Sequence, residues 1–293
     1  MKKILLTGAS GFVGSRYLAY SADKYQITPV SVKERLPSAD ELHGVDVVLH
    51  AGGLAHQMQW TAPERYFSAN YDTTRALADL AKQCGVGHFI FISTIKVFGE
   101  ANTGPLNENS PCLPVNDPYG ESKLQAEKYL QTIASDSFVV TIIRPPLIYG
   151  PGVKGNLDRL LHLADTGYWL PFGGIHNRRT MIYLDNLVEL INAAIDRKAG
   201  GIFLAADAKP LATSDLISQI RQCLGRPLRL FSLPGLFKKA LLRFKPELGQ
   251  RLFGSFEMDA TQSYRRLAFY PPYPVEQGIR DMVEAYQSKK LNR

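Results

Sequence analysis

Cysteine is scarce in this chain, and long apolar or basic runs are absent. The 293 residues include three cysteines, Cys84, Cys112 and Cys223, and none of them belongs to a Cys-x-x-Cys pair. Such a sparse, odd-numbered set argues against a disulfide framework and gives a metal site little support. No stretch approaches the roughly 18 consecutive apolar residues of a membrane-spanning helix. We therefore expect no bound metal and no integral membrane segment.

The amino terminus also lacks the features of a secretion signal. Two lysines precede an apolar run of only three residues, which ends at Thr7. The apolar core of a signal peptide is much longer than this. Together with the low cysteine content, the short run favours a cytoplasmic protein.

Clustered positive charge is absent as well, although the chain is basic overall. Lys and Arg number 34 against 27 Asp and Glu, for a net charge of +7, yet no run of five basic residues occurs. The sequence also carries no nucleic-acid-binding motif. We therefore expect no nucleic-acid partner, and a small polyphosphate ligand is the simplest explanation of the excess charge.

The first two-thirds of the chain alternates short apolar segments with longer amphipathic ones. This alternation predicts an α/β fold with a doubly wound parallel sheet of the Rossmann type, flanked by helices. Near-continuous apolar runs are typical of parallel strands buried on both faces. The expected strands are 3–7, 27–32, 46–50, 88–93, 139–144 and 202–206. The expected helices are 14–22, 64–84, 118–133 and 185–197.

After residue 150 the alternation weakens, and from residue 213 short helical segments alternate with Pro and Gly. This change predicts a smaller, mainly helical substrate lobe interleaved with the sheet. We assign 1–150 and about 178–206 to a dinucleotide-binding domain, and 151–177 and 207–293 to the second lobe.

A glycine-rich loop follows the first expected strand directly. In Gly8-x-x-Gly11-x-x-Gly14, the glycines suit a tight turn, a close approach of backbone to phosphate, and close packing of the next helix. The start of that helix offers free N–H groups to a pyrophosphate. The sequence therefore predicts a dinucleotide site. The cofactor contacts expected in this loop are Gly8, Ser10, Gly11, Phe12, Val13 and Gly14.

The choice between NAD and NADP depends on the end of the second strand. A carboxylate there binds the ribose hydroxyls of NAD, but this chain has Ser31. Lys33 and Arg35 follow closely, and Arg16 lies early in the first helix. The missing acid and the cations favour NADP slightly over NAD, with Arg16 and Lys33 as contacts. Solvated loop charges are the competing explanation for Lys33 and Arg35.

Tyr119 and Lys123 are the strongest catalytic candidates. In Tyr-x-x-x-Lys the two side chains share one face of a helix. A phenol titrates near pH 10, and a neighbouring ammonium lowers its pKa towards the range of a useful base. Thr94 follows an expected strand and is placed to bond the reacting oxygen and relay its proton to Tyr119. Ser93 is the alternative donor.

The order of motifs along the whole chain resembles the extended short-chain dehydrogenases/reductases. Within them it resembles the NAD-dependent epimerase/dehydratase family. The resemblance implies that Thr94, Tyr119 and Lys123 are catalytic and that Asn70 braces the sheet; it also makes a homodimer through the Tyr119 helix possible. The motifs are Gly8-x-x-Gly11-x-x-Gly14, Asp46 with His50-Ala51-Gly52, Asn70, Ser93-Thr94, Tyr119-x-x-x-Lys123, Arg144-Pro145-Pro146 and Tyr149-Gly150-Pro151-Gly152. The cofactor contacts that it implies outside the glycine loop are Asp46, His50, Ala51, Gly52, Ser93, Tyr119, Lys123 and Pro146.

Three further segments, 93–99, 150–156 and 177–186, look like a bacterial subgroup that reduces a nucleotide-sugar ketone. That resemblance implies reduction of the C4 ketone of a UDP-2-acetamido-2,6-dideoxy-hexos-4-ulose for surface polysaccharide. The alternative is a UDP-glucose or UDP-N-acetylglucosamine 4-epimerase with tightly bound NAD. Either activity makes a UDP-sugar the partner.

A UDP-sugar needs cations for its diphosphate and polar contacts for its hexose. Arg179, Arg251 and Asn156 match the family positions for these contacts, and a guanidinium suits a diphosphate. Surface solvation is the competing explanation for Arg251. Thr94 and Lys96 are the substrate contacts expected near the hexose. Lys96 departs from the small hydroxyl residue usual in 4-epimerases, and it either contacts the sugar or points away.

Overall fold

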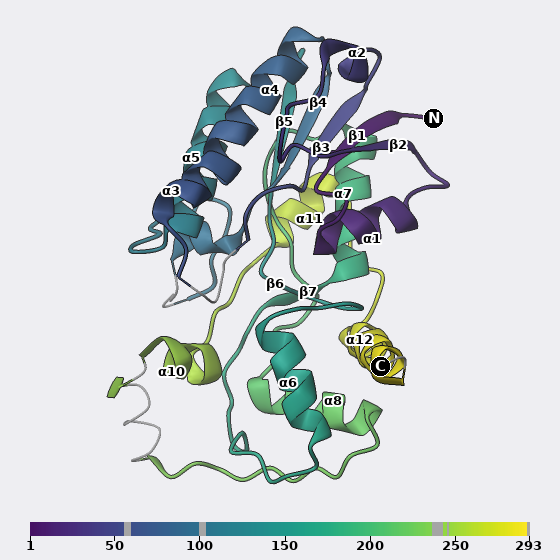
Figure 1. Ribbon diagram of the computed structural model, residues 1–293. Coiled ribbons are helices and arrows are strands. Elements are labelled where there is room, and N and C mark those ends of the chain that lie inside the picture. Colours follow the sequence, from purple (N-terminus) through teal and green to yellow (C-terminus); the bar gives the residue numbers. More distant parts are fainter. Residues whose placement is uncertain (56–59, 100–103, 236–242, 245, 292–293) are drawn as a thin grey trace.

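The structure is a computed structural model that describes residues 1–55, 60–99, 104–235, 243–244 and 246–291. Its centre is a six-stranded parallel sheet with the order β2-β1-β3-β4-β5-β8 (Figure 1). Because β1 has β2 on one side and β3 on the other, the chain reverses direction across the sheet at β1, where ligands bind in such folds. The strands are β1 (Lys3–Thr7), β2 (Gln26–Val30), β3 (Val47–His50), β4 (His88–Ile92), β5 (Val139–Arg144) and β8 (Gly201–Leu204).

The central strands are apolar because both of their faces are covered. Every residue of β3 and β4 is buried, as the continuous apolar runs predict. Helices α1 and α7 cover one face, and α4 and α5 cover the other (Figure 1). The predicted fold class is confirmed. These helices and the short α2 and α3 are α1 (Phe12–Tyr20), α2 (Ala39–Leu42), α3 (Pro63–Tyr66), α4 (Thr73–Gln83), α5 (Pro118–Ile133) and α7 (Leu184–Arg197).

The predicted helix 64–84 is one continuous helical segment with an irregular middle. A π-helical stretch over Phe67–Asp72 separates α3 from α4. π-Helical turns are uncommon and occur often at functional sites. This one carries Asn70, which is fully buried.

A second lobe lies beyond the carboxyl end of β5. Two short strands, β6 (Leu147–Tyr149) and β7 (Met181–Tyr183), pair in parallel, and α6, α8, α10 and α12 lie below them in Figure 1. Helix α11 (Thr261–Leu267) returns to pack on α7 and β8, so the segment 207–293 also contributes to the core of the sheet. In the described part of the chain, no helix has the length and apolarity needed to cross a bilayer. The lobe helices are α6 (Asn156–Asp165), α8 (Thr213–Cys223), α10 (Pro246–Phe253) and α12 (Val275–Leu291).

Asp207 joins the lobe to the sheet through a buried carboxylate. Its oxygens accept hydrogen bonds from Tyr149 Oη at 2.6 Å, from Asn186 Nδ2 at 2.7 Å and from the Tyr183 amide at 3.1 Å. Burial raises the pKa of Asp207, and these three donors counteract the rise. The carboxylate thereby holds β6, β7 and the start of α7 together.

Asp207→Ala is expected to destabilise the protein by at least about 3 kcal/mol, because three buried donors lose their acceptor and each costs about 1–3 kcal/mol. Urea unfolding measures the loss. Lys24→Ala is the control, since it breaks an exposed ion pair with Asp196 and an ammonium contact over the Tyr25 ring, and it should cost less than about 1 kcal/mol. An equal loss in the two variants would contradict this role of Asp207.

Candidate active site

The glycine loop can only be built from glycine at two of its positions. Gly8 has φ +76°, and a Cβ added there would lie 2.5 Å from the Gly52 nitrogen. A Cβ at Gly14 would lie 2.2 Å from the Gly8 carbonyl oxygen. The Gly11 amide donates to Gly8 O at 2.8 Å and closes the turn. No side chain caps the first turn of α1, so its N–H groups are suited to a phosphate.

His50 lies behind this loop and connects three elements. It is fully buried, with Nδ1 2.6 Å from Thr7 Oγ1 and Nε2 3.0 Å from Thr74 Oγ1. Burial, and then the charge of Lys123, lowers the pKa of His50 to about 3, so the imidazole is neutral at physiological pH. Gly52 N also donates to Thr7 Oγ1, at 3.3 Å. The His50–Gly52 segment is thus fixed at the carboxyl edge of the sheet, beside the glycine loop.

Asn70 fixes the next stretch of chain against the catalytic helix. Its Oδ1 accepts from Leu54 N at 2.8 Å, and its Nδ2 donates to Leu54 O and to Ser122 Oγ, both at 3.1 Å. Ser122 lies on α5 between Tyr119 and Lys123. The predicted bracing role of Asn70 agrees with these contacts, which run from the β3 loop to α5.

Helix α5 begins where the sequence predicts and presents Tyr119 and Lys123 on one face. Asp117 caps it by accepting from Gly120 N at 3.2 Å, and Pro118 occupies its first position. Lys123 is only 5% exposed. Its Nζ donates to Ile92 O, at the end of β4, at 2.9 Å. The lysine is therefore anchored to the strand that leads into Thr94.

The pKa values of this pair are moved in opposite directions by burial. Burial lowers the pKa of Lys123 to about 8, although the Glu127 carboxylate raises it in part. Burial raises the pKa of Tyr119 to about 12, although a hydrogen bond with Thr94 lowers it in part. A further positive charge next to the phenol would lower its pKa towards neutrality. The arrangement suits a phenol that exchanges a proton with a bound hydroxyl group.

Ser93 and Thr94 face different partners at the end of β4. Thr94 is 7% exposed and hydrogen-bonds Tyr119, and its Oγ1 also accepts from Lys96 N at 3.2 Å. Ser93 Oγ instead donates to the buried carboxylate of Glu127. Of the two hydroxyls proposed as donors, only that of Thr94 meets Tyr119.

Lys96 lies against the amino end of α5, the helix that carries the predicted catalytic residue Tyr119. Its Nζ is 3.3 Å from Asp117 Oδ2, and Asp117 precedes Tyr119 by two residues. The Asp117 charge raises the pKa of Tyr119, so the Lys96 ammonium offsets a charge that would disfavour the phenolate.

Two residues predicted to contact the cofactor are used elsewhere. Asp46 precedes β3 at the amino edge of the sheet, where its Oδ2 accepts from Lys3 N at 2.7 Å. The glycine loop is at the opposite edge, so the structure does not bring Asp46 to it. The Arg16 guanidinium makes a bidentate pair with Asp185 of α7, at 2.6 and 2.7 Å. Its charge is satisfied by the protein itself.

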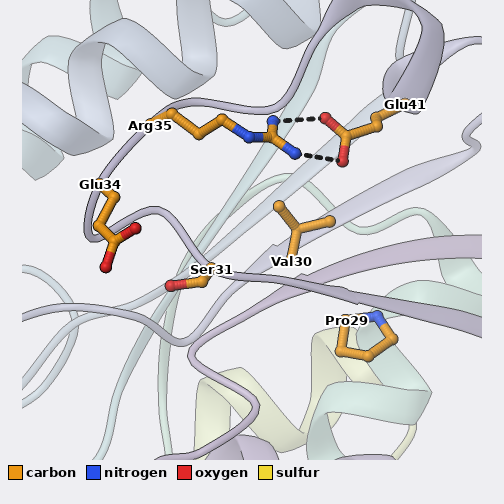
Figure 2. A pocket seen from close by; sticks show the side chains of 6 residues that line it. All are labelled: Pro29, Val30, Ser31, Glu34, Arg35 and Glu41. Carbon is orange, nitrogen blue, oxygen red and sulfur yellow. Dashed lines mark hydrogen bonds and ion pairs between the residues drawn. The ribbon is translucent and has the colours of Figure 1, made fainter.

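A pocket of about 340 Å³ lies at the carboxyl end of β2, where the adenosine ribose is expected (Figure 2). Arg35 there pairs with both oxygens of Glu41, at 2.7 and 3.0 Å, and Figure 2 shows this pair as parallel contacts. Lys33 is exposed on the same loop and is not one of the lining residues. The lining residues are Pro29, Val30, Ser31, Glu34, Arg35 and Glu41.

The predicted substrate residues of the second lobe lie around α6 and α10. Arg179 Nη1 donates to Gly254 O at 3.0 Å, and its backbone pairs with Leu211 and Phe256. Asn156 is exposed at the first turn of α6. Arg251 lies on α10, but its side chain is outside the described part of the structure.

Comparisons with known proteins agree with this geometry. Residues 4–206 match the model of the NAD dependent epimerase/dehydratase family. The chain belongs to this family.

Among relatives of this epimerase/dehydratase, a UDP-glucose 4-epimerase of Vibrio cholerae is 34% identical, with 97% of this chain and 95% of that protein covered. The N-acetyl-alpha-D-glucosaminyl-diphospho-ditrans,octacis-undecaprenol 4-epimerase of Escherichia coli O157:H7 is 31% identical, with 79% and 75% covered. A solved UDP-glucuronic acid 4-epimerase from Bacillus cereus in complex with NAD has a TM-score of 0.79 at 20% identity, covering 99% of this chain and 100% of that chain.

Residue patterns pointed to Thr94, Tyr119 and Lys123 but missed two residues that contact this group of side chains and their neighbours. Asp117 caps α5 and pairs with Lys96, and Glu127 binds Ser93 one turn beyond Lys123. The signal for Glu127 was present, because positions 119, 123 and 127 fall on one face of a helix. The pairing of Asp117 with Lys96 joins two distant segments of the chain, so no local pattern signals it.

The hydrogen bond from Thr94 generates a prediction about pH. Because this bond lowers the pKa of Tyr119, Thr94→Val should raise that pKa. Tyr119 must lose its proton to act as a base, so the acid limb of the pH–rate profile for sugar oxidation should move to higher pH. The rate at pH 7 should fall at least about 100-fold. A pH–rate profile tests this, with Thr94→Ser as the control that restores the profile. Coincident profiles for wild type and Thr94→Val would contradict the assignment.

Proposed function

We propose that this chain is a nucleotide-sugar 4-epimerase that inverts C4 of a UDP-hexose. The observation that carries the proposal is the Thr94–Tyr119 hydrogen bond, with the buried Lys123 one helical turn after Tyr119, at the edge of the sheet that bears the glycine loop. The family assignment supports it, as does a 4-epimerase that is similar over nearly the whole chain. The UDP-hexose is inferred from those relatives and from the basic residues around α6 and α10.

A nicotinamide dinucleotide fits the residues at this edge. The uncapped start of α1 and the glycine loop would hold its pyrophosphate, and Lys123 would hold the nicotinamide ribose. When bound, the nicotinamide supplies the acceptor and donor of hydride for the sugar carbon.

The side chains of the site handle the proton. Thr94 orients the C4 hydroxyl, and the Tyr119 phenolate accepts its proton. The Lys123 ammonium stabilises the phenolate while it is charged. After the keto sugar has rotated so that it presents its other face, Tyr119 returns the proton to the C4 oxygen. Arg179, Arg251 and Asn156 would hold the diphosphate so that only the hexose rotates.

The second candidate is a reductase for the 4-ketone of a UDP-2-acetamido-2,6-dideoxy-hexose. The observation that favours it is Lys96, whose ammonium lies near the reacting groups where a small hydroxyl residue is usual. In this reaction Tyr119 is the proton donor to the new alkoxide. The 4-epimerase stands first because two relatives that are more than 30% identical to this chain are 4-epimerases.

NAD fits the described residues better than NADP, which the cations of the sequence favoured. Arg16 and Arg35 favoured a 2′-phosphate, yet each is paired with a carboxylate of the protein. Glu34 also lines the ribose pocket and would repel a phosphate. A structural relative contains NAD, although another contains NADPH.

The second lobe, formed by 151–177 and 207–293 with the β6–β7 pair at its border with the sheet, would bind the nucleotide sugar, apart from α11, which packs on the sheet. A homodimer would form through α4 and α5, which lie together on one side of the sheet (Figure 1).

The first test is interconversion of UDP-glucose with UDP-galactose, or of UDP-N-acetylglucosamine with its C4 epimer, followed by NMR without added cofactor. We expect the wild type to interconvert the sugars and Tyr119→Phe to have a kcat at least about 100-fold lower. Tyr129→Phe is a matched control on the same helix, where the hydroxyl bonds Asp79, and it should leave kcat unchanged. If the UDP-sugars stay unchanged but NADPH or NADH is oxidised when the 4-keto substrate is added, the reductase assignment replaces the epimerase assignment.

The cofactor is tested by denaturing fresh protein and identifying the released nucleotide. We expect NAD in near-stoichiometric amount, and for refilled protein a Kd for NAD at least about tenfold below that for NADP. Glu41→Gln should narrow this ratio, because Arg35 loses its carboxylate partner. Tighter binding of NADP to the wild type would contradict the proposal.

A further inference from the structure

A fully buried ion pair lies directly beneath the catalytic residues. Glu127 is 0% exposed and follows Lys123 by one helical turn, so Tyr119, Lys123 and Glu127 occupy successive turns of one face of α5. Arg144, at the end of β5, is 2% exposed. Its Nε lies 3.0 and 3.2 Å from the two Glu127 oxygens, and its Nη2 lies 2.6 Å from Oε2.

The Glu127 carboxylate also accepts a hydrogen bond from the hydroxyl of Ser93, the residue before Thr94. The Ser93 amide in turn donates to Ile143 O of β5 at 2.8 Å. One carboxylate therefore joins the ends of β4 and β5 to the catalytic helix. Since β4 delivers Thr94 and α5 delivers Tyr119 and Lys123, Glu127 lies where the two halves of the catalytic set meet.

Stability alone is a poor explanation for this pair. Taking two charges out of water costs several kcal/mol for each ion, and apolar replacements of buried pairs are often neutral or stabilising. The charge of Glu127 has a consequence that an apolar residue would not supply, because it acts on the ammonium of Lys123.

We propose that Glu127 is a positioning residue for catalysis, which holds Thr94 against Tyr119 through Ser93 and keeps Lys123 in its charged form. Arg144 fixes the carboxylate in the orientation that both contacts need. The role rests on the proposed proton transfer by Tyr119, and it applies to the epimerase and the reductase alike.

The charges around Lys123 support this role. Burial lowers the pKa of Lys123, and Glu127 is the carboxylate that raises it. His50 of β3 is neutral and adds no charge, and Tyr119 of α5 is uncharged until it gives up its proton. Arg144 of β5 faces Glu127 rather than the lysine. Removal of the Glu127 charge should therefore lower the pKa of Lys123 below about 8.

Glu127→Gln is the central variant, because it keeps the size and a hydrogen-bonding amide but removes the charge. We expect kcat to fall about 10-fold to 100-fold with KM for the sugar nearly unchanged, as when reacting groups are slightly displaced. The alkaline limb of kcat should move to lower pH, because Lys123 loses its proton earlier. Ser93→Ala should lower kcat by a smaller factor and leave that limb in place.

Asp207→Asn is the matched control, since it neutralises another buried carboxylate that lies outside the site. It should lower the melting temperature without moving the alkaline limb. If Glu127→Gln lowers the melting temperature in the same way but leaves both kcat and the pH profile unchanged, the residue is only structural and the proposal is overturned.

A readout independent of turnover separates this proposal from the proposed function. The side-chain nitrogen of Lys123 is followed by NMR in protein labelled with 15N-lysine, its signal being assigned by its loss in Lys123→Arg. We expect a pKa near 8 in the wild type and a lower value in Glu127→Gln. Equal values in the two proteins would overturn the electrostatic role even if the sugar assay succeeds, whereas a lowered value would uphold it even if UDP-hexoses are not the substrate.

Discussion

The donation from Lys123 to the carbonyl of Ile92 is the contact on which the rest of the site depends. It places a charged group inside the protein, against the last residue of a central strand, and so fixes the distance between α5 and β4. A buried ammonium is costly and persists only where carbonyls and carboxylates surround it. Around Lys123 lie the neutral His50, Asn70 and the buried Glu127. Each of these residues also holds a neighbouring element in place.

Much of this arrangement was readable from the sequence, because the relevant information is local. The glycine spacing reflects contacts among residues a few positions apart, namely the Gly8 turn and the Gly14 approach. The Tyr119–Lys123 spacing is one helical turn, and the strand runs are apolar because both of their faces are buried. Such features depend on neighbours along the chain, and the structure reproduces them with strand and helix ends shifted by a few residues at most.

The parts that the sequence did not reveal depend on partners far away along the chain. Arg16 appeared available to a cofactor, yet it meets Asp185, 169 positions later. The family resemblance implied a cofactor contact for Asp46, but this residue lies at the amino end of β3, away from the glycine loop. Ser93 and Thr94 point in different directions because successive side chains of an extended segment alternate, but which of the two meets Tyr119 depends on how α5, with Tyr119 and Glu127, packs against β4.

The connections of β6 and β7 have a consequence for how this architecture varies in evolution. Strand β6 follows β5 after two residues, and β7 runs straight into α7, while α11 carries the chain back to the sheet. The second lobe is therefore a set of segments threaded through the half that contains the sheet, and not an appended module. Recombination at a single point cannot exchange it, since any one crossover would also divide the sheet. The lobe and the sheet are therefore inherited together, and the lobe varies by changes within its own segments.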